Sequence, residues 1–114
     1  VSNFSFHHKG SGDVEMKNLE TTNLTIAMLG SGDFKADGGS AKNQTINVSG
    51  SGNVEISDLS GESSTIAIKG SGDVKVNVNS SLLGNIMGSG NLSYKGDPKN
   101  KQVDIMGSGE VTKL

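Results

Sequence analysis

The chain has 114 residues, which is the size of a single domain. Its net charge is −2 and it has no arginine, so the basic surface that a nucleic-acid-binding protein needs is missing. The absence of cysteine excludes disulfides and thiolate metal sites, and no apolar run approaches the ~20 residues of a membrane span.

Glycine and serine contribute 17 residues each, while hydrophobic residues make up only 32% of the chain. This composition alone is typical of a flexible linker. The glycines, however, recur at a fixed period. The tripeptide Gly-Ser-Gly begins at residues 10, 30, 50, 70, 88 and 107, so successive copies are 20, 20, 20, 18 and 19 residues apart. A linker has no reason to keep such a period, whereas a repeat architecture requires one.

Apolar residues flank each Gly-Ser-Gly at alternate positions. In the first unit Phe6 and His8 precede the glycines, and Val14 and Met16 follow them. Later units hold, before their glycines, Ile26 and Met28, Ile46 and Val48, Ile66 and Ile68, Gly84 and Ile86, and Val103 and Ile105. After their glycines they hold Phe34 and Ala36, Val54 and Ile56, Val74 and Val76, Leu92 and Tyr94, and Val111 and Lys113. A two-residue alternation indicates a strand with one buried face, so each unit is predicted to be strand, corner, strand and polar return.

Two short strands cannot bury their apolar faces alone, but stacked units can. The sequence therefore predicts an all-β, single-domain parallel β-helix, or β-solenoid, with about six coils of 18–20 residues and Gly-Ser-Gly-Asx corners, covering residues 1–114. The outward residues after the first four corners support this stacking, because Glu15, Lys35, Glu55 and Lys75 would alternate in charge between neighbouring coils. Thr25, Thr45 and Thr65 would form a second outward column.

The corner glycines could be interpreted as a phosphate-binding loop, but neither a Gly-Lys-Ser/Thr sequence nor a helix follows them. A sharp corner repeated in every coil needs residues that tolerate positive φ or a close approach of two backbones. We therefore predict a structural role for Gly10, Gly12, Gly30, Gly32, Gly50, Gly52, Gly70, Gly72, Gly88, Gly90, Gly107 and Gly109.

The residues that follow the corners carry side-chain oxygens: Asp13, Asp33, Asn53, Asp73, Asn91 and Glu110. Stacked, they would form a column that could ligate a hard cation such as calcium. Asp and Asn in turns more often accept hydrogen bonds from the backbone, and calcium-binding β-rolls repeat about every nine residues. We predict the backbone role, predict no metal site, and keep a cation-binding solenoid as an alternative.

The other reactive side chains form no recognisable catalytic set. His7 and His8 are adjacent, so on a strand they point to opposite faces, with His8 inward. Tyr94 takes an inward position, which favours packing over sugar binding. Glycoside hydrolysis needs paired carboxylates, whereas the aspartates outside the corners fall in different registers: Asp37, Asp58, Asp97 and Asp104. We predict no enzyme activity, no catalytic or cofactor-binding residues and no cofactor.

The repeated pattern resembles the head GIN domain of the auto-transporter adhesin family, secreted proteins of the Bacteroidetes. The C-terminal third is the most specific part, with Asp73-Val74-Lys75-Val76, Ser81-Leu82, the run from Gly88 to Pro98, and Gly107-Ser108-Gly109 before a final Val-Thr-Lys-Leu. The resemblance extends from about Phe6 to Leu114. It implies a parallel β-helix, export to the periplasm, outer-membrane surface or extracellular space, and no established catalytic residues. Together with the crossover rule, it also predicts a right-handed coil.

We expect a non-enzymatic structural or adhesive module whose polar ladders bind a surface glycan or protein through many weak contacts. The alternative is a carbohydrate-binding or polysaccharide-processing surface protein. Domains of the family are usually longer at the N-terminus, so the chain corresponds either to a whole domain or to the C-terminal part of a longer one. The first coil would expose Phe4, Phe6 and an unpaired strand edge, and we expect self-association through it. Neither a nucleic-acid partner nor a membrane span is expected.

Overall fold

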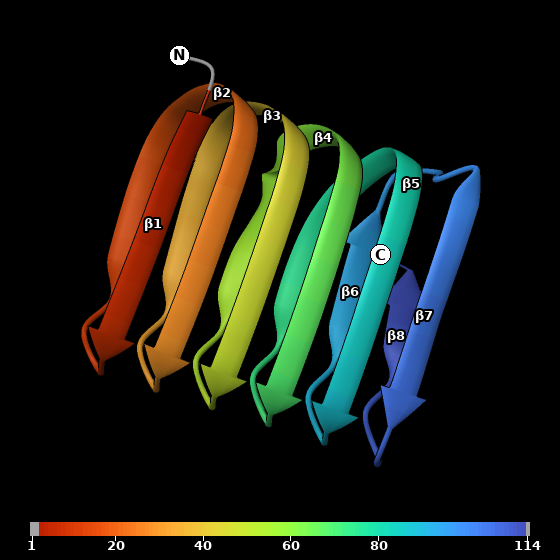
Figure 1. Ribbon diagram of the computed structural model, residues 1–114. Helices are drawn as coiled ribbons and strands as arrows, with labels where there is room; N and C mark the ends of the chain where they lie inside the picture. The colour runs from red at the N-terminus through yellow and green to blue at the C-terminus, as the bar shows by residue number, and fades with distance from the viewer. Residues whose placement is uncertain (1–2, 114) are drawn as a thin grey trace.

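The computed structural model describes residues 3–113 (Figure 1). Val1 and Ser2, at the start of the predicted domain, and Leu114, the end of the Val-Thr-Lys-Leu motif, lie outside the described residues. The described chain contains eight strands and no helix: β1 (Asn3–Gly10), β2 (Val14–Gly30), β3 (Phe34–Gly50), β4 (Val54–Gly70), β5 (Val74–Gly88), β6 (Leu92–Lys95), β7 (Asn100–Met106) and β8 (Val111–Lys113). No segment of residues 3–113 is therefore a helix that could cross a membrane.

The strands pair in parallel, each with the equivalent strand of the next coil. From β1 to β4 equivalent positions of successive units are paired, so Phe6 pairs with Ile26, Ile26 with Ile46, and Ile46 with Ile66. Strand β5 then pairs with both β6 and β7, and β6 pairs with β8. The predicted parallel β-solenoid of about six coils is confirmed.

Each coil has two sides, which Figure 1 shows as a near and a far layer. We call the near layer the front sheet: residues 3–10, 23–30, 43–50, 63–70, 81–88 and 100–106. The back sheet is formed by the segments that follow the Gly-Ser-Gly corners, from Val14 to Val111. A curved segment, the arch, returns the chain from the back sheet to the front sheet. In Figure 1 each coil descends in front, rises behind and advances toward β7, which is a right-handed path.

The core lies between the two sheets. Ile26, Ile46 and Ile66 form one inward column of the front sheet and are 0–1% exposed. Val54, Val74 and Leu92 form the facing column of the back sheet, also 0–1% exposed. The predicted alternation of buried and exposed residues is therefore the packing pattern of these coils, and most of the core side chains are aliphatic, with Phe34 and Tyr94 as the buried aromatic residues.

Gly84, which departs from the apolar pattern, is explained by its neighbour across the core. It pairs with Ile66 and Val103 in the front sheet, and a Cβ at this position would lie 3.2 Å from Cδ2 of Leu92. Leu92 takes the place that the smaller Val74 has in the previous coil. The larger leucine fills the volume that the glycine leaves open.

The repeat unit between Gly70 and Gly88 is shorter than those before it, and the shortening takes place in the arch. Val54 pairs with Val74, which keeps the register of the earlier coils, but Ser63 pairs with Ser81 instead of Leu83. The register shifts lie between Glu55 and Ser60 and between Gly61 and Ser63. The corner is therefore kept unchanged, while the arch of the fifth coil is shorter than the arches before it.

The two ends of the stack differ in chemistry. At the N-terminal end the inward residues Phe4, Phe6, Val14, Met16 and Leu19 are only partly buried. At the C-terminal end two lysines continue inward columns, because Leu82 pairs with Lys101 and Tyr94 pairs with Lys113. The Nζ atom of Lys101 lies 3.2 Å from the Tyr94 hydroxyl and 5.1 Å from the centre of its ring. Lys113 Nζ lies 3.8 Å from Asp97 Oδ1. The core thus ends in an apolar edge at the N-terminal end, whereas at the C-terminal end the two lysines stand beside the incompletely buried Val103, Ile105 and Val111.

Candidate functional site

Backbone contacts between coils close the Gly-Ser-Gly corners. The first glycine of each corner has φ between +107° and +125°, a region that favours glycine. A Cβ at Gly30 would lie 2.6 Å from the carbonyl oxygen of Gly10, and one at Gly32 would collide with the carbonyl of Gly12. The N–H groups of Ser31 and Gly32 both donate to the Gly10 carbonyl at 3.2 Å. Comparable bonds are made by Ser51, Gly52, Ser71, Ser89 and Gly90. Because coil stacking occupies these donors, they are not free to bind a phosphate.

The side chains that follow the corners form a ladder to the backbone of the next coil. Asp13 Oδ1 accepts the N–H of Asp33 at 3.1 Å, and Asp33 Oδ1 accepts the N–H of Asn53 at 3.1 Å. Asn53, Asp73 and Asn91 continue the ladder to Glu110 with distances of 3.0–3.1 Å. One oxygen of each of the five side chains from Asp13 to Asn91 is thus committed to the backbone. Among residues 3–113, no group of three or more His, Asp or Glu side chains is arranged to hold a metal ion.

The outer face of the back sheet carries alternating charges. Glu15 pairs in register with Lys35, Lys35 with Glu55, and Glu55 with Lys75, as the repeat predicts. Lys35, however, forms its ion pair with Asp37 of the same strand, at 3.9 Å between Nζ and Oδ1. Lys35 is exposed and Asp37 is only partly buried, so this pair contributes little to stability. Parallel stacking aligns the charges but does not by itself bring them into contact.

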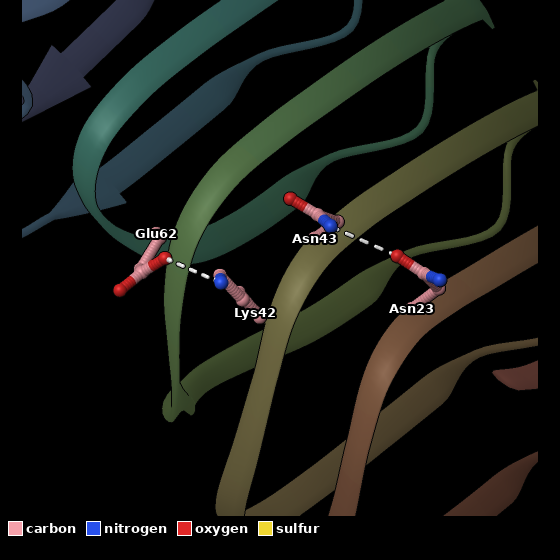
Figure 2. Close-up of polar contacts among 4 residues, drawn as sticks. All are labelled: Asn23, Lys42, Asn43 and Glu62. Carbon is pink, nitrogen blue, oxygen red and sulfur yellow. Dashed lines mark hydrogen bonds and ion pairs between the residues drawn. The ribbon is translucent and has the colours of Figure 1, made fainter. Parts of the chain in front are cut away.

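The outer face of the front sheet carries stacked polar columns, which we call the front ladder face. Its first column is Asn3, Asn23, Asn43, Ser63, Ser81 and Asn100, and its second begins Ser5, Thr25, Thr45 and Thr65. Asn23 Nδ2 donates to Asn3 Oδ1 at 2.7 Å, and Asn43 Nδ2 donates to Asn23 Oδ1 at 2.9 Å. Figure 2 shows the second of these bonds. The sequence interpretation identified the threonine column but missed the asparagine ladder, although both follow the spacing of the corners.

An open depression of about 360 Å³ lies on the arch beside this face. We call it the arch depression; it is lined by Thr21, Thr22, Ser40, Lys42, Ser60, Gly61, Glu62 and Asn79. In Figure 2 the side chains of Lys42 and Glu62 point toward each other across neighbouring coils, with 3.9 Å between Nζ and Oε2. Below it, Ser64 Oγ donates to the buried Gln44 Oε1 at 2.6 Å, and Gln44 Nε2 donates to the Ala41 carbonyl at 3.3 Å. The depression was not predicted, since it depends on the shape of the arch.

The remaining candidate residues lie apart from one another. His8 is half-buried at the N-terminal end, stacked on the Phe6 ring with 6.0 Å between centroids, while His7 is exposed on the other face. The His8 Nε2 atom is buried and has no hydrogen-bond partner. Tyr94 is buried beneath Lys101. The scattered acidic residues lie on the back sheet, the arch, the loop after β6 and the front sheet: Asp37, Asp58, Asp97 and Asp104.

Comparison with known proteins supports the fold and shows the family. The chain resembles a solved structure of a putative adhesin from Bacteroides fragilis NCTC 9343, with a TM-score of 0.84 and 24% sequence identity. The likeness covers 100% of this chain and 54% of that chain, so the present chain spans about half of its length. At this identity the likeness shows the fold alone. No curated protein matches the chain.

The family match covers residues 1–98 and ends before β7 and β8, so the Gly107-Ser108-Gly109 ending lies outside it. The coil nevertheless continues to Lys113. Since the match includes most of the chain and agrees with the resemblance of the repeat, the chain belongs to the family described as "Putative auto-transporter adhesin, head GIN domain".

Proposed function

We propose that the chain is a non-enzymatic adhesive module that is exported to the periplasm, the outer-membrane surface or the extracellular space, and that it binds through the front ladder face. The observation that carries this proposal is the stacking of Asn3, Asn23 and Asn43 beside the threonine column. Membership of an adhesin family supports the same interpretation.

The front ladder face is suited to binding by repetition. The first three rungs, at Asn3, Asn23 and Asn43, present the same amide donors and acceptors about 4.8 Å apart, which is the spacing of neighbouring strands. A ligand with repeating polar groups can therefore make many weak contacts at once, and such contacts multiply in avidity. The bonds between neighbouring asparagines hold the side chains in place before binding, which lowers the entropic cost of ordering them.

The adhesion experiment uses two matched substitutions. Thr45→Lys places a long charged side chain in the middle of the front ladder face, and Thr112→Lys makes the same change on the outer face of the back sheet. Beads coated with each variant are applied to a glycan array and to immobilised extracellular-matrix proteins. We expect Thr45→Lys to lose binding and Thr112→Lys to keep it. Equal loss in both variants, or no binding by the unchanged chain, would contradict the proposal.

Export and the lack of enzyme activity are tested separately. The separation of Asp37, Asp58, Asp97 and Asp104 over different elements supports a non-enzymatic role, because polysaccharide hydrolysis uses carboxylates on both sides of one bond. Incubation with plant, fungal and bacterial polysaccharides should release no new reducing ends. Fractionation of cells that express the natural gene should place the protein outside the cytoplasm, and recovery from the cytoplasm would refute the localisation.

We also propose that two copies associate through their N-terminal coils. The partly buried Phe4 and Phe6 lie at an edge that lacks a strand partner within residues 3–113, and exposed edges invite pairing. The C-terminal end of a second copy also exposes apolar residues, Val103, Ile105 and Val111, but Lys101 and Lys113 place two positive charges among them, which an apolar edge would have to desolvate. The N-terminal edge of one copy is therefore best matched by the N-terminal edge of another.

The oligomer experiment introduces at the N-terminal end a lysine like those found at the C-terminal end. Phe4→Lys places a lysine in the column that ends in Lys101 at the other end of the stack. Light scattering after size-exclusion chromatography should show a dimer for the unchanged chain and a monomer for Phe4→Lys, with the β-sheet circular dichroism unchanged. A monomer at every concentration of the unchanged chain would overturn this proposal without affecting adhesion by the front ladder face.

A further inference from the structure

The arch depression combines a fixed shape with side chains that suit a particular ligand chemistry. We infer that it binds a neutral oligosaccharide laid along the axis of the solenoid. This inference rests on the proposed adhesive function, since it names a ligand class and a place of contact beside the front ladder face.

The floor of the depression is backbone held by buried groups. Gly61 lines the depression with its backbone alone, because a Cβ at this position would point inward and collide with the amide of the buried Gln44. The register shifts that shorten the fifth coil flank the same residue, and Asn79 of that coil donates from Nδ2 to the Gly61 carbonyl at 3.4 Å. Gln44 is itself held by Ser64 and by the Ala41 carbonyl. These hydrogen bonds fix the arch backbone that underlies the depression before any ligand arrives.

The lining favours hydrogen bonding to an uncharged ligand. The exposed hydroxyls of Thr22, Ser40 and Ser60 can each donate and accept. The Thr21 hydroxyl donates to the Asn23 carbonyl and the Asn79 amide donates to the Gly61 carbonyl, so these two side chains offer mainly their oxygens as acceptors. The two charged residues of the lining, Lys42 and Glu62, lie 3.9 Å apart and offset each other. Glu62 would repel an anion bound here, and Lys42 would repel a cation. A neutral polyhydroxyl ligand is repelled by neither residue and can form hydrogen bonds to both Lys42 and Glu62.

The dimensions favour a short oligomer over a single sugar. The lining residues come from four successive strands, β2 to β5, so the depression spans three strand spacings, or about 14 Å. Its volume of about 360 Å³ is at the small end of the range of about 300–1,000 Å³ for ligand sites. None of its lining residues is aromatic, so we expect weak affinity at one site, with avidity supplied by many copies on one surface.

The test is a titration followed by two-dimensional amide NMR on the uniformly labelled chain. The probes are cellotetraose, mannotetraose and maltotetraose at millimolar concentrations, with trigalacturonic acid as the anionic comparison. We expect at least one neutral tetrasaccharide to shift the resonances of Thr22, Ser40, Ser60, Gly61 and Asn79, and trigalacturonic acid to shift them less.

The matched variants are Ser40→Ala/Ser60→Ala, which removes two exposed hydroxyls from the depression, and Ser31→Ala/Ser51→Ala, which removes two exposed hydroxyls from the corners. The first should weaken binding about fivefold to tenfold and the second should leave it unchanged. Shifts confined to Thr25 and Thr45, or no shifts with any neutral tetrasaccharide, would overturn the inference. If adhesion remained sensitive to Thr45→Lys in either case, the proposed function would still stand.

Discussion

Replacing His8 by methionine is expected to stabilise the protein. His8 occupies an inward column that continues as Met28, Val48 and Ile68, each at most 2% exposed. Its Nε2 atom is buried without a hydrogen-bond partner, and an unsatisfied buried polar group costs about 1–3 kcal/mol. The substitution also removes the stacking of His8 on Phe6, and such aromatic pairs are worth about 0.5–1.5 kcal/mol.

The difference between these two effects gives a net gain of about 0.5–2 kcal/mol, since a methionine sulfur recovers part of the contact with the Phe6 ring. For a domain of this size the gain corresponds to a rise in Tm of about 2–8 °C. The assay is thermal unfolding followed by circular dichroism at one protein concentration. His7→Met is the matched control, because His7 is exposed and its replacement should change stability by no more than about 0.5 kcal/mol. A Tm for His8→Met equal to or below that of the unchanged chain would refute the reasoning.

Three further predictions concern the contacts between coils, and each is measured by urea unfolding. Asp33→Ala removes an acceptor of the corner ladder and should lower the free energy of unfolding by about 0.5–1.5 kcal/mol. Asp33→Asn keeps the accepting oxygen and should be nearly neutral. An equal loss of stability in both variants would show that the charge matters and the hydrogen bond does not. Gly52→Ala places a Cβ against the carbonyl of Gly32 and should lower the free energy of unfolding by about 1–3 kcal/mol. Ser51→Ala, at the exposed neighbouring residue, should leave stability unchanged. If Gly52→Ala also left stability unchanged, the coils would not be packed this closely. Ser64→Ala leaves the buried Gln44 Oε1 without its donor and should lower the free energy of unfolding by about 1–3 kcal/mol. Adding Gln44→Leu should restore much of this stability. A double variant less stable than Ser64→Ala alone would contradict this account.

The fold could be predicted because, in stacked coils, residues that lie one repeat apart in the sequence become neighbours in space. Once Gly-Ser-Gly recurs at a fixed period, Thr25 must stand beside Thr45 and Glu15 beside Lys35, whatever the details of packing. The same argument places the inward residues, because Ile46 and Val48 alternate with outward neighbours along one strand. The asparagine ladder could have been found in the same way, from Asn3, Asn23 and Asn43.

Other features depend on geometry that the repeat does not specify. Lys35 pairs with Asp37 rather than with Glu15 or Glu55, because a long exposed side chain can choose among several partners. The shortening of the fifth coil is visible in the spacing of the glycines, but only the backbone shows that the arch absorbs it. The arch depression is formed by the arches of four successive strands, β2 to β5, and its shape is not encoded in the spacing of the corners.

The most direct test of the architecture is a set of backbone NOEs between coils, because every surface described above depends on parallel stacking. The structure predicts NOEs that join Thr25 to Thr45, Thr45 to Thr65, and Thr65 to Leu83, each pair lying in neighbouring coils. A hairpin around each corner, with residues 26–30 paired antiparallel to residues 32–36, would give a different set of NOEs. Observation of that set, without the NOEs between neighbouring coils, would contradict the solenoid and every surface assigned to it.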